Sequence, residues 1–123
     1  TGRAAIVAGD YQTRDEQVGI IRENLSTLIA VRAIYYLQAG KNQLADGQYG
    51  AAFHSLSEGY GFIYSLKFTH NPETGAPYIS AGNVEDYLEQ LMIGNGFWEV
   101  TPETLDSISE EIAAPFEFTV ADV

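Results

Sequence analysis

GQYGAAFHSLSEGYGFIYSLKF, residues 47–68, is the stretch that decides the fold. Phe53, Leu56, Tyr60 and Ile63 recur at spacings of three and four residues, which is the period of one face of an α-helix. Further apolar residues widen this face until little polar surface remains, as is typical of a helix packed on more than one side. The pattern predicts a long central helix over residues 47–68.

Two glycines lie in the middle of this predicted helix. Each of Gly59 and Gly61 costs about 1 kcal/mol of helix stability relative to alanine. Close approach of a neighbouring helix or of tyrosine side chains would offset that cost. We therefore expect tight packing along this part of the segment.

His54 and Glu58 stand one helical turn apart and therefore share a face. Three interpretations are open. Glu58 orients His54 by a hydrogen bond or pairs with a cation on the next helix, for which Arg32 is our candidate. Alternatively, the two residues bind iron or another divalent metal ion together with an undetermined third group, since one pair supplies only two of the roughly four ligands that a metal needs. A catalytic role of the pair is the third.

A second long helix is expected before the central one. Thr13 with Glu16 forms a capping-box pattern at its start, and Gly40 is the expected residue at its end. The connection that follows, residues 41–47, is short, so the two helices should form an antiparallel hairpin. A stripe at heptad-like spacing runs along the helix through Val18, Ile21, Leu25, Leu28, Arg32 and Tyr35.

The flanking segments complete an all-α prediction. The apolar run 4–8 is expected to be the end of a helix. After a loop over residues 69–82, Asn83 should cap a third helix, and Thr101 with Pro102 should begin a fourth. Residues 116–120 alternate like a short extended tail. The sequence thus predicts an antiparallel helical bundle with two long central helices, two shorter helices and an extended C-terminal tail, all in one domain over residues 1–123.

Composition excludes several function classes. Seventeen acidic against six basic residues give a net charge of −11, which argues against a nucleic-acid partner. No apolar run reaches the ~18 residues of a membrane span, and the absence of cysteine excludes disulfides and thiolate metal sites. Neither a phosphate-binding loop nor a zinc-protease motif occurs. We therefore expect a protein that is not an enzyme.

The strings HSLSEGYGFIYSLKF at 54–68, GFWEVT at 96–101 and LDSISEEIAAPFEF at 105–118 resemble the C-terminal part of the DUF4856 family. The resemblance implies a mostly helical bacterial protein that is secreted or attached to the cell surface, often through a lipid anchor. It also implies that the chain is the C-terminal part of a longer protein with a role near metal acquisition. Imelysin-like proteins, with which members are associated, carry a Gly-x-His-x-x-Glu signature. Here Ala52 replaces its glycine, and Glu58 follows His54 by four residues.

Two functions follow as hypotheses. The first is a non-enzymatic extracytoplasmic protein linked to iron or metal uptake, with His54 and Glu58 as ligands. The second is a structural or interaction module that assembles with itself or with a partner chain. For the second, the apolar residues at 4–8 and 116–120 are the expected contact surfaces.

Overall fold

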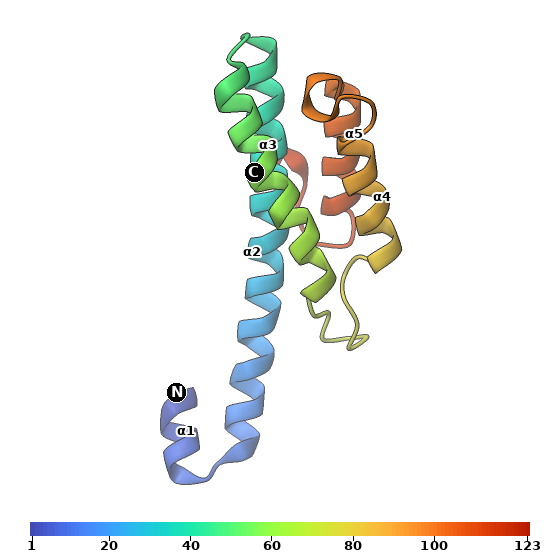
Figure 1. Ribbon diagram of the computed structural model, residues 1–123. Helices are drawn as coiled ribbons and strands as arrows, with labels where there is room; N and C mark the ends of the chain where they lie inside the picture. The colour runs from blue at the N-terminus through green and yellow to red at the C-terminus, as the bar shows by residue number, and fades with distance from the viewer.

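The longest helix, α2 (Tyr11–Ala45), is the element on which the others pack (Figure 1). The computed structural model describes residues 1–123. After α2 the chain turns back into α3 (Tyr49–Ser65), which continues as a short 3-10 helix, η1 (Leu66–Phe68). The predicted antiparallel hairpin is confirmed. However, α2 is the more central of the two helices, because it packs against α1, α3 and α5.

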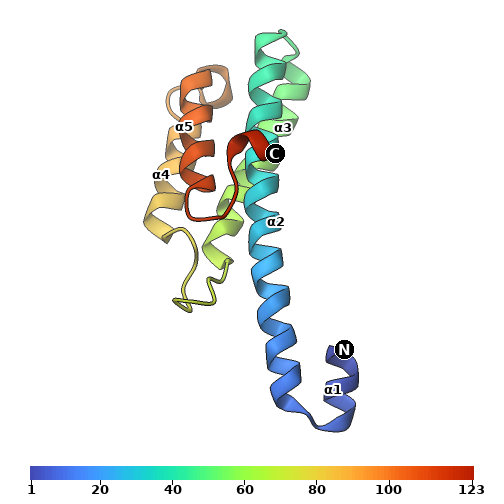
Figure 2. The same ribbon diagram turned by 180° about the vertical axis from the view of Figure 1, so that it is seen from behind.

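A second layer of shorter helices covers one side of the hairpin. It consists of α4 (Ala81–Leu91), the 3-10 helix η2 (Gly96–Trp98) and α5 (Pro102–Ala113). The C-terminal segment then passes back over α2 and ends in η3 (Val120–Asp122), as Figure 2 shows. No strand is present, so the all-α prediction is confirmed.

One hydrophobic core lies between the two layers. It contains 17 buried residues, to which α2 contributes only from Ala30 onward. We call residues 26–123 the head. The preceding part, α1 (Gly2–Ala8) with the first turns of α2, extends beyond the head as a stalk, residues 1–25 (Figure 1). The apolar run 4–8 is helical as predicted, and the left-handed conformation of Gly9 (φ 71°) ends α1.

Both predicted ends of α2 are wrong. The helix begins two residues before Thr13, because Asp10 is its N-cap and accepts a hydrogen bond of 3.1 Å from the Thr13 N–H. It also continues past Gly40 to Ala45. Gly40 is instead buried against α3, where a methyl group would lie 2.6 Å from Leu56 Cδ2.

The two glycines of α3 have different roles. Gly59 is buried, and a methyl group there would lie 3.4 Å from Leu37 and Tyr36. Gly61 is exposed, with no neighbour within 4 Å of such a methyl group. The expected close approach is therefore confirmed at Gly59 and wrong at Gly61.

In the second layer, one cap was predicted correctly and one was not. Thr101 caps α5 and accepts a hydrogen bond of 3.2 Å from the Thr104 N–H, as expected. Ser80 caps α4 and accepts from the N–H of Asn83, so the helix starts earlier than the predicted Asn83 cap.

The C-terminal tail is not extended in the expected way. Residues 114–117 form turns. Within them the Phe116 ring is buried and stacks on Tyr78, with ring centroids 4.3 Å apart. The alternation of apolar residues therefore reflects side chains that dock on the head.

Candidate functional site

His54 and Glu58 lie on the solvent-exposed face of α3. The buried face of this helix is formed by Ala52, Ser55, Leu56, Gly59 and Ile63. At 3.6 residues per turn, His54 points roughly away from that face. The His54 imidazole is exposed to solvent, and no hydrogen bond joins it to Glu58, so the interpretation in which Glu58 orients His54 is wrong.

Arg32 is not the partner of Glu58. Its guanidinium donates a hydrogen bond of 2.7 Å to Tyr36 Oη and lies over the Tyr35 and Tyr36 rings, 4.9 and 4.6 Å from their centroids. A guanidinium is weakly hydrated and stacks readily on aromatic rings, which makes this arrangement favourable in the apolar part of α2. Arg32 consequently has no carboxylate partner in the chain.

Nowhere in the chain do three His, Asp or Glu side chains come together closely enough to hold a metal ion. A metal bound by His54 and Glu58 would therefore need further ligands that these side chains do not provide. The metal site stays a prediction.

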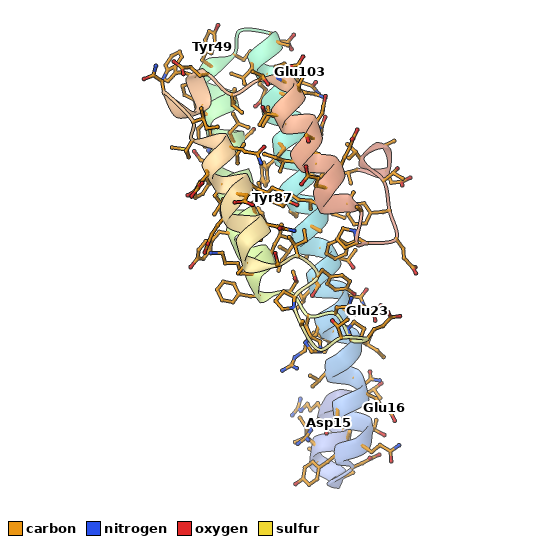
Figure 3. The ribbon with its side chains drawn as sticks, turned by 90° about the vertical axis from the view of Figure 1, so that its right-hand side faces the viewer. Asp15, Glu16, Glu23, Tyr49, Tyr87 and Glu103 are labelled. Atoms are coloured by element: carbon orange, nitrogen blue, oxygen red, sulfur yellow. The ribbon has the colours of Figure 1, made fainter.

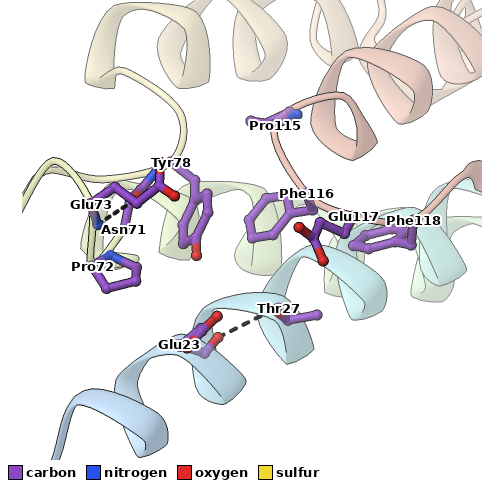
Figure 4. A pocket seen from close by; sticks show the side chains of 10 residues that line it. All are labelled: Glu23, Thr27, Asn71, Pro72, Glu73, Tyr78, Pro115, Phe116, Glu117 and Phe118. Atoms are coloured by element: carbon purple, nitrogen blue, oxygen red, sulfur yellow. Dashed lines mark hydrogen bonds between the residues drawn. The ribbon is translucent and has the colours of Figure 1, made fainter. Parts of the chain in front are cut away.

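A cavity of about 410 Å³ lies where the stalk joins the head (Figure 4). It is formed where α2, the loop after η1 and the C-terminal segment meet. Three carboxylates line it, Glu23, Glu73 and Glu117, and no basic side chain does. Burial raises the pKa of the Tyr78 phenol on its wall, and the three carboxylates raise it further. A cavity with this charge attracts cations and repels anions.

The exposed side of α2 carries a row of apolar side chains that the rest of the chain leaves partly uncovered. Ile21, Leu25 and Leu28 are 56%, 52% and 53% exposed. The structure extends the predicted stripe backward by two positions at the same spacing, to Arg14 and Tyr11. We call the α2 stripe the row Tyr11, Arg14, Val18, Ile21, Leu25, Leu28, Arg32 and Tyr35.

The α2 stripe faces away from the head. The residues of α2 that are buried in the head include Ser26, Ala30 and Ala33. At 3.6 residues per turn, the middle of the stripe lies on average roughly 130° around the helix from these residues. Figure 3 shows Asp15 and Glu16 on the stalk, well apart from Tyr87 inside the head. The aliphatic residues of the stripe are exposed, whereas Arg14 and Arg32 are half-buried, and Arg32 lies 6.0 Å from the Phe62 ring of α3.

Sequence reasoning missed Tyr11 because it placed the helix start at Thr13. Arg14 lies inside the predicted helix and was left out because the stripe was begun at Val18. The signal that could have found them is the spacing itself, since Val18, Arg14 and Tyr11 continue the same alternation of four and three residues. The acid-lined cavity had no such signal, because its residues come from three distant segments.

The fold and this surface define an all-α protein with a two-layered helical head and an apolar stalk. No helix has both the length and the hydropathy required to cross a membrane, as predicted. The chain belongs to the family described as Domain of unknown function (DUF4856), whose model matches residues 1–119. Comparison with curated proteins and with solved structures found no match.

Proposed function

We propose that the protein is a helical assembly module in which the α2 stripes of two copies pack against each other. The observation that carries this proposal is the row of half-exposed aliphatic side chains on the part of α2 that leaves the head. Contiguous exposed apolar surface of this kind marks interaction sites on folded proteins. Its heptad spacing is the pattern by which two helices interdigitate.

The energetics favour a reversible association. Fully burying a Val, Leu or Ile side chain contributes about 1.5–3 kcal/mol, and Val18, Ile21, Leu25 and Leu28 are buried only in part. Covering them would add about 1 kcal/mol each, or about 8 kcal/mol for two chains. The lower estimates of the cost of bringing two molecules together are about 4 kcal/mol. The remaining gain of about 4 kcal/mol corresponds to a dissociation constant of about 1 mM. We therefore expect a weak dimer that dissociates on dilution.

The stalk itself gains from such a contact. Before Ser26, no residue of α2 is buried, and α1 is the helix that lies beside it there (Figure 1). The part of α2 without buried residues, 11–25, is about as long as the isolated helices that are only marginally stable in water. A second helix along the stripe would supply the missing packing.

The tail contributes less to this surface than expected. Phe116 is only 8% exposed, because Tyr78 and the core cover it within the same chain. In the run 4–8, by contrast, Ile6 and Val7 remain exposed on α1. The proposed interface therefore consists of the α2 stripe with α1 beside it.

A second proposal concerns location and ligand. We keep the placement outside the bacterial cytoplasm and the link to iron or metal acquisition as proposals that rest on the family resemblance. The feature that supports a cationic ligand is the negative charge of the cavity lined by Glu23, Glu73 and Glu117, although these carboxylates are not close enough to one another to hold a metal ion together.

Sedimentation equilibrium of the purified chain tests the assembly proposal. The wild type should show a concentration-dependent monomer–dimer equilibrium, and Leu25→Glu/Leu28→Glu should be monomeric because it places charges in the interface. Ile93→Glu is the matched control, since Ile93 is 67% exposed on the head, away from the stripe. It should dimerise like the wild type. A wild type that stays monomeric at every concentration, or a Leu25→Glu/Leu28→Glu variant that still dimerises, would refute the proposal.

A further inference from the structure

We infer, on the basis of the proposed assembly, that the second copy runs antiparallel along the α2 stripe about a two-fold axis. In the inferred register Val18 faces Leu28 of the second copy, and Ile21 faces Leu25. The occupant of the apolar stripe is thus another molecule of this chain, and the register follows from the order and charges of the stripe residues.

The stripe has the same chemical order read from either end. Tyrosine stands at both ends, as Tyr11 and Tyr35, followed inward by arginine, as Arg14 and Arg32, and then by aliphatic residues. An antiparallel pair about a two-fold axis places each residue opposite the residue at the mirrored position. Every layer then joins side chains of the same kind, with tyrosine opposite tyrosine and aliphatic opposite aliphatic.

The two ends also share their local geometry. The Arg14 guanidinium lies over the Tyr11 ring at 4.7 Å, and that of Arg32 lies over the Tyr35 ring at 4.9 Å. Each guanidinium thus lies over a tyrosine ring of the same chain. The like-charged guanidinium groups that meet in this layer are therefore partly held apart.

Charge selects the antiparallel direction. Arg32 has no carboxylate partner in its own chain. In the inferred register it lies beside residues 10–16 of the second copy, which carry Asp10, Asp15 and Glu16 against the single cation Arg14. The residue directly opposite Arg32 is an arginine in both directions, Arg14 in the antiparallel pair and Arg32 in a parallel pair in register. Only the antiparallel pair adds acidic residues beside it, because residues 28–36 contain none. Opposite charges facing each other across an interface favour that arrangement over alternatives.

The net charges of the two heads also favour the antiparallel direction. The stalk contains three arginines and four acidic residues, a net charge of −1, whereas the head contains three basic and thirteen acidic residues, a net charge of −10. Antiparallel pairing places a nearly neutral stalk beside each head. Parallel pairing would bring two strongly negative heads side by side, which is unfavourable.

The residues that line the acidic cavity do not obstruct this arrangement. The residues of α2 that line the cavity, Glu23 and Thr27, point roughly away from the stripe at 3.6 residues per turn. The pair would therefore be an elongated molecule with both acidic cavities near the middle of the overlap, on the sides of the helices that point away from the stripe.

Disulfide trapping tests the register, because the chain has no cysteine of its own. Val18→Cys and Leu28→Cys are made as separate variants. The inferred register predicts that an equimolar mixture forms cross-linked dimers at least about tenfold more than either variant alone, since two thiols introduced at position 18 would be about 15 Å apart, beyond disulfide reach. Ala51→Cys, on the exposed face of α3, mixed with Val18→Cys is the control and should not cross-link.

The outcomes separate the two proposals. If Val18→Cys cross-links with itself, the pair is parallel and this inference is overturned while the assembly stands. If Val18→Cys pairs with Ile21→Cys instead of Leu28→Cys, the register is wrong. If no variant cross-links and the wild type sediments as a monomer, both fail, and the stripe belongs to a different chain. Circular dichroism matching the wild type checks that each variant is folded.

Discussion

At the residue scale, Gly40 and Gly61 offer a matched pair of substitutions. Both lie within helices, but a methyl group at Gly40 would meet Leu56 at 2.6 Å, whereas one at Gly61 would meet nothing. Gly61→Ala should raise the free energy of unfolding by up to about 1 kcal/mol through helix propensity. Gly40→Ala gains the same propensity and loses about 1–3 kcal/mol to overpacking. Urea denaturation should therefore show Gly40→Ala to be the less stable variant; equal stabilities would contradict the close approach of α2 and α3.

The phenol of Tyr87 should lose its proton at a higher pH than an ordinary tyrosine does. Burial, together with the nearby Glu111 carboxylate, raises its pKa to about 12. Because the ordinary pKa of tyrosine is about 10, the folded state holds this proton more tightly than the unfolded state does. The resulting stabilisation is complete below pH 10 and is lost as pH rises toward 12.

Denaturation at several alkaline pH values measures this loss. The free energy of unfolding of the wild type should fall across that window more steeply than that of Tyr87→Phe, which has no proton to lose. Ultraviolet absorbance of the wild type should show a tyrosine that ionises late, and this late component should be missing from Tyr87→Phe. Parallel pH profiles of the two proteins would contradict the assignment.

His54 is the residue through which the metal prediction is tested. If the predicted site exists, metal analysis of purified protein should find a stoichiometric ion in the wild type and a clear loss in His54→Ala. His70→Ala controls for non-specific loss of imidazole, since these are the only two histidines. Absence of metal from both the wild type and the His54 variant removes the prediction.

At the scale of elements, α5 is joined to α2 by a polar cluster at the edge of the core. Lys41 Nζ and Gln38 Nε2 donate to Asp106 Oδ1 at 2.6 and 2.9 Å. Hydrogen bonds from Lys41 and Gln38 lower the pKa of Asp106. The stabilisation from this cluster is therefore present above the ordinary pKa of aspartate and is lost as pH falls through the lowered value.

A double-mutant cycle with Lys41→Met and Asp106→Asn isolates the ion pair. Its side chains are 24% and 46% exposed, so we expect a coupling of only about 0.5–1 kcal/mol at neutral pH. The coupling should vanish in strong acid. A coupling that persists there would show that packing, and not charge, joins the two helices.

The elements themselves were largely predictable, because helical periodicity is a local signal. Thr101 and the hairpin were found in this way. Gly40 was not, since a glycine that ends a helix and one that admits a neighbouring helix look alike in sequence. Nor can periodicity say whether a stripe faces a core or solvent, so the exposure of Leu25 and Leu28 required the structure. The acidic cavity depends on three segments that meet only after folding.

At the scale of the whole molecule, the uneven distribution of charge leads to a prediction about how the dissociation constant depends on salt. In the inferred antiparallel pair, the positions of Leu37 in the two heads lie about 40 Å apart along the helices. This exceeds the Debye length of about 10 Å at 0.1 M salt, so repulsion between the heads is screened. The dissociation constant should therefore change by less than about threefold between about 0.05 and about 0.5 M sodium chloride.

Sedimentation equilibrium across this salt range measures the effect. If the heads lay side by side, their charge of −10 each would make dimerisation strongly salt-dependent, with tighter binding as salt rises. Arg32→Gln provides the internal comparison, because it removes the cation that faces the acidic end of the second stalk. This variant should bind more weakly than the wild type at low salt, and the difference should shrink at high salt. Salt-strengthened binding of the wild type would instead place the two acidic heads together, which the antiparallel pair does not allow.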